Sequence, residues 1–275
     1  MSWLESILLG LVQGLTEFLP VSSSGHLVIF QKLIGLPEHM LAFDIAVHMG
    51  TLFSVFVVYR QQILQVIYDL ITFLKTKNLN RGANLFLMVF IGSIPTAIIG
   101  FTLKDMFERL FQSLFAVGIF LFITGLILLL TRNKQMADKN DDFFSLEGLE
   151  NLKWWHALVI GTAQGGAIAP GISRAGSTIA TGILVGLSRK TASLFSFMLS
   201  IPAILGATLL EFKDIEHWSP EFVTIMSVGF VSAFVFGLIG LKVVLHFVKK
   251  GRLEVFTFYL WALSFCIITW HFLKG

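Results

Sequence analysis

The sequence predicts an all-α integral membrane protein with six transmembrane helices and two re-entrant helical hairpins in an inverted-topology repeat. Three observations lead to this fold class. The composition is too apolar for a soluble globule, and six stretches are long enough to cross a bilayer. In addition, two pairs of short apolar stretches are each interrupted by a polar break, and the two breaks resemble each other.

The composition separates this chain from soluble proteins. Of its 275 residues, 55% are hydrophobic and 13% are charged, whereas a soluble domain carries about 25% charged residues. A globule of this size cannot hide so many hydrophobic side chains from water. So apolar a composition excludes a disordered chain. The net charge of +3 comes from 20 basic and 17 acidic residues spread along the chain with no basic patch, which excludes nucleic-acid binding as the main function. Cys266 is the single cysteine, so no intrachain disulfide forms.

The first element is a predicted hairpin. An apolar stretch at 2–12 lacks the basic start of a cleaved signal peptide, so we expect it to belong to the mature fold. A Gly/Ser/Pro-rich break and a second short apolar stretch at 26–36 follow. Apolar stretches of about 10–14 residues suit re-entrant segments, whose non-helical tip is tolerated where protein or a wet cavity satisfies its polar groups.

Six stretches have the length of about 20 apolar residues that a bilayer-crossing helix needs. Three of them precede a polar segment of mixed charge at 132–153, which we expect to be a cytoplasmic loop. An amphipathic segment at 63–74 is expected at the membrane interface. The predicted spans are 41–59, 83–103, 113–131, 191–210, 222–241 and 255–273.

A second hairpin is predicted after the loop, from the short apolar stretches 154–163 and 179–187. Its break repeats the Gln-Gly, Pro-x-x-Ser and later Gly of the first break. Because three spans separate the two hairpins, the second enters from the opposite face. Inverted repeats with broken helices point to a site near the bilayer midplane. We therefore divide a single domain, 1–275, into repeats at about 1–131 and 154–275.

Lysine and arginine predict the orientation, because they are enriched in cytoplasmic loops. Most of the 20 basic residues gather on one predicted face, in clusters at 60–81, 132–153, 189–190 and 249–252. This face is expected to be cytoplasmic. The N-terminal hairpin then enters from the outer side and the second hairpin from the inner side of a multi-pass protein surrounded by membrane lipids.

The second break has the composition of an anion site. Ionisable side chains at membrane depth are costly and functional by default, and Arg174 stands there at the start of a short helix. Free N–H groups at a helix start favour an anion, and the guanidinium fork suits phosphate oxygens. Gly171 and Gly176 permit close backbone approach. Hydroxyl donors are supplied by Ser173, Ser177 and Thr178.

The first break supplies a second anion cradle. Either Ser23 or His26 is the candidate nucleophile, with His26 or Glu17 as the base for Ser23. Glu17 is also a candidate ligand of a divalent cation, Mg²⁺ or Ca²⁺, which would screen phosphate charge. An ion pair between Glu17 and Arg174 is an alternative reason for both charges to lie at membrane depth. The helix of this cradle opens at Ser22, Ser23, Ser24 and Gly25.

Two long motifs in the right order make the whole chain similar to a known family. The segments 13–26 and 170–174, supported by 43–51, resemble the signature motifs of the bacterial undecaprenyl-diphosphate phosphatases, the bacitracin-resistance family. The resemblance implies the same six spans and two inverted hairpins. It implies removal of the terminal phosphate from undecaprenyl diphosphate in the bacterial cell membrane, which recycles the lipid carrier for peptidoglycan synthesis and gives bacitracin resistance. It is also compatible with a homodimer.

The resemblance extends to single residues. It places Gln13 with Glu17 near a metal or the diphosphate, and it implies phosphate contacts and a nucleophile among the residues of the two breaks. Asp44 and His48 share one face of the first span at a spacing of i, i+4 and are secondary candidates. There are two departures from the family pattern. Gln13 cannot ionise, so the first motif holds one carboxylate, and Ala175 replaces a serine.

Two other functions share some of these features. Lipid phosphatases of the acid-phosphatase superfamily use Ser-Gly-His and Ser-Arg fragments, found here at 24–26 and 173–174, but no histidine follows the second fragment before His217. The Lys/Arg-Pro signature of that superfamily is also missing. A transporter or flippase for an anionic polyprenyl lipid would use the same inverted-repeat architecture. Turnover separates these functions, because only an enzyme frees phosphate from a dispersed substrate.

Overall fold

A computed structural model describes residues 1–36, 40–132, 144–214 and 219–274. Within these ranges the chain folds into helices and no strands. Two short 3-10 helices, Leu149–Asn151 and Phe212–Asp214, accompany the α-helices. The α-helices are α1 (Trp3–Phe18), α2 (Ser23–Leu33), α3 (Leu41–Val58), α4 (Arg60–Thr76), α5 (Arg81–Thr102), α6 (Lys104–Phe111), α7 (Leu114–Leu129), α8 (Trp154–Gly166), α9 (Arg174–Leu184), α10 (Arg189–Glu211), α11 (Pro220–Lys250) and α12 (Val255–Lys274).

The helices confirm an all-α membrane protein. By length and composition four described helices are able to cross a bilayer, and the number rises to six when the bent pairs α3–α4 and α6–α7 each count as one span. The axes bend by 77° between α3 and α4 and by 103° between α6 and α7. Each predicted span contains its own long helix, namely α3, α5, α7, α10, α11 or α12. Residues 133–143, half of the predicted loop 132–153, lie outside the described residues, so the repeat boundaries that depend on the loop stay predictions.

One span is longer than predicted. Helix α11 continues to Lys250 instead of ending near residue 241. Its last turns keep Val244, Leu245 and Val248 buried, so one apolar face of the helix still packs on the protein core. The helix ends with the basic residues Lys249 and Lys250. Amphipathic packing of this kind stabilises a helix beyond the length that the bilayer requires.

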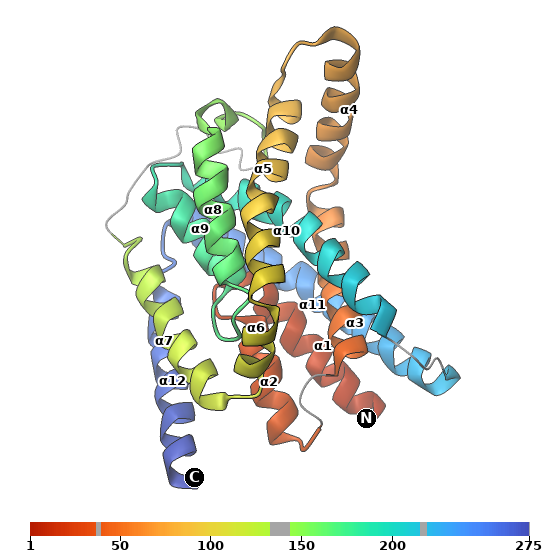
Figure 1. Ribbon diagram of the computed structural model, residues 1–275, viewed down its shortest axis with the longest axis vertical. Helices are drawn as coiled ribbons and strands as arrows, with labels where there is room; N and C mark the ends of the chain where they lie inside the picture. The colour runs from red at the N-terminus through yellow and green to blue at the C-terminus, as the bar shows by residue number, and fades with distance from the viewer. Residues whose placement is uncertain (37–39, 133–143, 215–218, 275) are drawn as a thin grey trace.

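Both predicted hairpins are present as helix pairs, α1–α2 and α8–α9. Figure 1 shows α8 and α9 in the upper half of the molecule and α1 and α2 in the lower half, so their tips approach from opposite ends. The breaks are shorter than we predicted, because α1 continues to Phe18 and α9 already begins at Arg174. Gln13 and Glu17 therefore lie one turn apart on a helix. The charge of Glu17 is tolerated there because Gln13 and Arg174 both donate hydrogen bonds to it.

The two halves exchange contacts in a matching way. Helix α1 packs along α11 of the second half, α8 packs along α5 of the first half, and α7 packs on α12. Glycine permits both close crossings. A Cβ on Gly10 would lie 2.6 Å from the carbonyl oxygen of Gly229, and one on Gly161 would overlap the carbonyl of Gly92. Small residues let membrane helices approach closely. Glycine stands at both crossings, as expected for two repeats with the same packing in opposite orientation.

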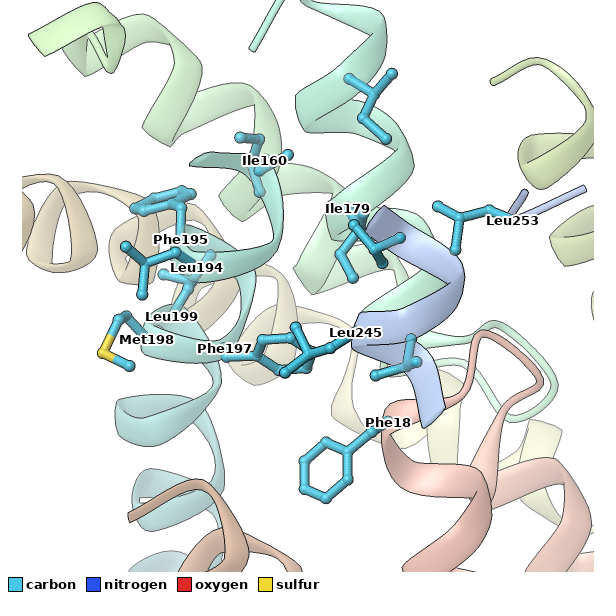
Figure 2. Packing of buried hydrophobic residues seen from close by; sticks show 14 of the residues in the cluster. Phe18, Ile160, Ile179, Leu194, Phe195, Phe197, Met198, Leu199, Leu245 and Leu253 are labelled. Atoms are coloured by element: carbon cyan, nitrogen blue, oxygen red, sulfur yellow. The ribbon is translucent and has the colours of Figure 1, made fainter. Parts of the chain in front are cut away.

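The apolar core holds the last turn of α1 in place. Phe18 is fully buried, and its ring lies edge-on to Phe197 of α10 with centroids 5.9 Å apart. Figure 2 shows Phe18 below Phe197 and Leu245, at the lower edge of the cluster formed by α8, α9, α10 and α11. Because Glu17 is the neighbour of Phe18, this packing positions the carboxylate that the hairpin tips share.

Candidate active site

The tips of the two hairpins touch each other through a serine. Ser22 Oγ accepts a hydrogen bond from Gly171 N of the second tip at 3.1 Å and one from Gly25 N at 3.3 Å, which caps α2. Ser173 plays the matching part at α9, where its Oγ accepts from Gly176 N at 3.0 Å. The positive ends of two helix dipoles therefore converge at one buried point, an arrangement that favours a bound anion.

The glycines of the tips are needed for this contact. A Cβ on Gly25 would lie 3.1 Å from the Cα of Gly171, and one on Gly176 would lie 3.1 Å from the Cβ of Pro20. Gly171 also has φ of +99°, a conformation that other residues rarely adopt. We predicted that Gly171 and Gly176 permit close approach of the backbone to a ligand, which stays a prediction. In the structure the opposite tip and α7 occupy the space where a Cβ on these glycines would lie.

Glu17 is the centre of the site and is 7% exposed. Arg174 Nη2 of the second half donates to Glu17 Oε1. The other oxygen, Oε2, accepts from Ser23 Oγ at 2.5 Å and from Gln13 Nε2 at 2.9 Å. His48 Nε2 of α3 lies 3.9 Å from the same oxygen. The predicted ion pair between Glu17 and Arg174 is therefore present. The hydroxyl of Ser23 is hydrogen-bonded to the same carboxylate.

Three buried polar atoms of the predicted site residues have no protein partner within the described part of the chain. They are the second terminal nitrogen of Arg174, the hydroxyl of Ser177 and the amide oxygen of Gln13. Buried polar groups are normally hydrogen-bonded, and an unpaired one is costly. The guanidinium nitrogen and the hydroxyl are donors of the kind that phosphate oxygens accept from.

His26 is engaged at both ring nitrogens. Its Nδ1 lies 2.7 Å from the carbonyl oxygen of Ser22, and its Nε2 lies 2.6 Å from the hydroxyl of Tyr259 on α12. Ser24 Oγ lies 3.3 Å from Ser22 Oγ and adds a further hydroxyl to this tip. The sequence left the nucleophile open between Ser23 and His26. The geometry places Ser23, and not His26, against the carboxylate.

Two predicted residues make their hydrogen bonds elsewhere. Thr178 is fully buried and shares a hydrogen bond of 2.6 Å with Ser196 of α10. Asp44 accepts from Gln31 Nε2 of α2 at 3.1 Å, a contact that ties the first span to the first hairpin. Of the secondary pair, it is His48 whose side chain approaches Glu17.

Sequence reasoning missed two residues that build the site. Thr124 of α7 donates to the carbonyl of Gly171 at 2.9 Å and accepts from Ser173 N at 3.1 Å, so it holds the second tip from the side. Tyr259 contacts the first tip through a side chain, because its hydroxyl lies 2.6 Å from His26 Nε2. A polar side chain within an otherwise apolar span is the signal that was available for both of them.

Glu17 and Gln13 could hold a divalent cation only if a bound substrate supplied further oxygen ligands. Among the described residues no group of three or more His, Cys, Asp or Glu is able to hold an ion. Glu17 offers one carboxylate and Gln13 offers a buried amide oxygen without a partner. Mg²⁺ is commonly bound by one or two carboxylates together with substrate phosphates. These two residues would supply the protein's share of such a shell.

Fold and site together define a multi-pass membrane protein in which two inverted hairpins enclose a buried Glu–Arg–Ser centre. The family described as bacitracin resistance protein BacA matches residues 6–266. The chain belongs to this family.

Curated relatives of similar length carry one name. An undecaprenyl-diphosphatase of Carboxydothermus hydrogenoformans is 43% identical over 272 residues, which cover 98% of this chain and 97% of that protein. One from Alkaliphilus metalliredigens is 41% identical over 283 residues, covering 99% and 100%. One from Desulforapulum autotrophicum is 41% identical over 270 residues, covering 94% and 95%. The similarity thus extends over nearly the full length of both partners in each pair.

Proposed function

We propose that this protein is a phosphatase of the bacterial inner membrane that hydrolyses undecaprenyl diphosphate to undecaprenyl phosphate and inorganic phosphate. This reaction recycles the lipid carrier for peptidoglycan synthesis and confers bacitracin resistance. The observation that carries the proposal is the meeting of Arg174 and Ser23 on the two oxygens of Glu17. The names of the full-length relatives support the same substrate. Whether the protein forms a homodimer stays a prediction.

Substrate binding uses the groups that lack protein partners. The terminal phosphate accepts hydrogen bonds from Arg174 and Ser177, and it lies where the positive ends of α2 and α9 converge. Phosphate oxygens compete with Glu17 for the guanidinium. Binding therefore draws Arg174 toward the substrate and leaves Glu17 with Ser23. A divalent cation held by Glu17 and Gln13 together with the diphosphate would screen the phosphate charge.

Ser23 is the nucleophile in this proposal. Its Oγ attacks the terminal phosphorus and passes its proton to Glu17 Oε2, the oxygen that it already contacts at 2.5 Å. The bond between that phosphorus and the bridging oxygen breaks, and undecaprenyl phosphate leaves with the bridging oxygen. Water then attacks the phosphorus of the phosphoserine, and the bond between Ser23 Oγ and phosphorus breaks. Glu17 returns its proton to Ser23 Oγ, and inorganic phosphate leaves with the oxygen and both protons of the water. Arg174 stabilises the charge on the phosphoryl oxygens in both steps.

The test is phosphate release from a long-chain polyprenyl diphosphate by the purified protein in detergent. Wild type is compared with Arg174→Ala and with Lys242→Ala, which removes an exposed cation on α11. We expect Arg174→Ala to lower turnover by about 100-fold or more, in the range known for a lost charge-stabilising donor. We expect Lys242→Ala to retain turnover. Equal losses would mean that the phosphate site is wrongly placed.

The same assay covers the cation and the transporter alternative. Mg²⁺ or Ca²⁺ is supplied and then removed with a chelator, and loss of turnover with the chelator is expected if Glu17 and Gln13 share a cation with the substrate. Folded wild-type protein that releases no phosphate under any of these conditions would instead favour a transporter of anionic polyprenyl lipid. The family and the names of its members do not favour that alternative.

A further inference from the structure

The contact between Tyr259 and His26 joins the last helix of the second half to the tip of the first hairpin. The Tyr259 hydroxyl lies 2.6 Å from His26 Nε2, and the two rings are stacked with centroids 5.8 Å apart at 13°. His26 is 4% exposed, whereas Tyr259 is 49% exposed. Tyr259 lies on a helix able to cross the membrane, where a hydroxyl needs a hydrogen-bond partner, so the specific part of this contact is its hydrogen bond.

The direction of the hydrogen bonds follows from their partners. His26 Nδ1 lies 2.7 Å from the carbonyl oxygen of Ser22, which only accepts, so Nδ1 carries the proton. In the neutral ring Nε2 is then an acceptor. The Tyr259 hydroxyl therefore donates to His26, and His26 donates to Ser22. A one-way chain of hydrogen bonds runs from α12 into the backbone of the first tip.

The residue at the end of this chain has an unusual backbone conformation. Ser22 has φ of 69° and ψ of 94°, and it is one of two described non-glycine residues with positive φ. Such a conformation persists only where the surroundings hold it. His26 holds the Ser22 carbonyl, and Gly171 N holds the Ser22 side chain. The next residue is Ser23, whose Oγ must stay on Glu17.

We propose that Tyr259 is a positioning residue that acts through His26. Its hydroxyl orients the imidazole, the imidazole fixes the Ser22 carbonyl, and this keeps Ser23 Oγ against Glu17. The inference rests on the proposed function, because it assigns Tyr259 to the reaction in which Ser23 is the nucleophile. The contact that Tyr259 makes with the first tip is the one with His26, so its loss should lower turnover more than substrate binding.

The first experiment uses Tyr259→Phe, which keeps the stacked ring and removes the hydroxyl. The matched control is Tyr68→Phe on α4, where the tyrosine is 67% exposed and far along the chain from the site. We expect Tyr259→Phe to lower kcat about five- to tenfold, as loss of one hydrogen bond would, with KM changed less than about twofold. Tyr68→Phe should match wild type. A wild-type kcat in Tyr259→Phe, or a loss confined to KM, would overturn the inference.

The second experiment asks whether Tyr259 acts through His26. Tyr259→Phe is measured in wild type and in a His26→Ala background, with radiolabelled substrate so that slow release over hours is counted. We expect the tyrosine substitution to change kcat by less than about twofold when His26 is absent, because coupled residues are not additive. The same loss in both backgrounds would show that Tyr259 acts by another route. Failure of the proposed function is seen separately, as no release by wild type.

Discussion

Glu17 accounts for much of the chemistry of this protein at the scale of single residues. A buried carboxylate is expensive at membrane depth unless it is paired and hydrogen-bonded. Glu17 meets this requirement with a guanidinium on one oxygen and with a serine and an amide on the other. The same partners leave it able to accept the proton of Ser23 once a phosphate competes for Arg174. Structural pairing and catalysis thus use one arrangement of side chains.

Ser23→Ala tests the nucleophile. The substitution removes the only hydroxyl that contacts Glu17 within the described residues, so we expect phosphate release to fall by about 100-fold or more. The matched control is Ser227→Ala on α11, an exposed serine whose hydroxyl bonds to its own helix. Release is measured in detergent with both variants at equal amounts of folded protein. Near-normal turnover in Ser23→Ala would transfer the role of nucleophile to another group.

Gln13→Glu tests the partial cation shell. The side chain is fully buried, and its amide nitrogen lies 2.9 Å from Glu17 Oε2. Glutamate at this position brings two like charges together, and such a pair must take up a proton or bind a cation. We expect the variant to lose more activity than wild type in a chelator and to recover when Ca²⁺ or Mg²⁺ is titrated back. Identical cation dependence of both proteins would contradict a shared cation at these two residues.

At the scale of elements, the hairpins depend on how closely their first arms lie on the helices of the opposite half. The crossing of α8 and α5 has no room for a side chain, because a Cβ on Gly161 would overlap the carbonyl of Gly92. The α9 arm begins at Arg174, a few residues after α8 ends at Gly166. Any shift of α8 is therefore passed on to the guanidinium.

Gly161→Ala should separate α8 from α5. Overpacking of a tight contact typically costs about 1–3 kcal/mol, so we expect a lower midpoint of thermal unfolding in detergent and reduced phosphate release. Gly166→Ala is the control on the same helix, because a Cβ there meets no atom within 4 Å. If the two variants unfold at the same temperature, the crossing does not limit stability.

The fold could be predicted further than the site, and particular residues show why. Span length and the repeated Gln-Gly and Pro-x-x-Ser pattern indicate helices and hairpins, because these are local properties of the chain. The pairing of Glu17 with Arg174 could be anticipated, since two opposite charges at membrane depth need each other. Thr124 and Tyr259 could not, because their roles depend on which spans lie beside the tips. The extension of α1 through Glu17 was missed for the same reason.

The whole molecule also has a predicted direction in the membrane, which rests on the uneven distribution of Lys and Arg. Figure 1 shows both termini at the lower end and the connection between α4 and α5 at the upper end. The upper connection and the helix ends beside it carry the basic residues Lys75, Lys77 and Arg81, so we expect them in the cytoplasm. The turn between α6 and α7 is then expected on the outer side.

Cysteine labelling of intact cells tests this orientation. The native thiol is removed with Cys266→Ser, and a new one is placed either at Asn78, between α4 and α5, or at Gln112, between α6 and α7. A membrane-impermeant thiol reagent should label Gln112→Cys in intact cells and label Asn78→Cys only after the cells are opened. The reverse pattern would show that the protein has the opposite orientation in the membrane. The first hairpin, with Glu17 and Ser23, would then enter from the cytoplasmic side. Phosphate release by both variants in detergent shows that the labelled protein is folded.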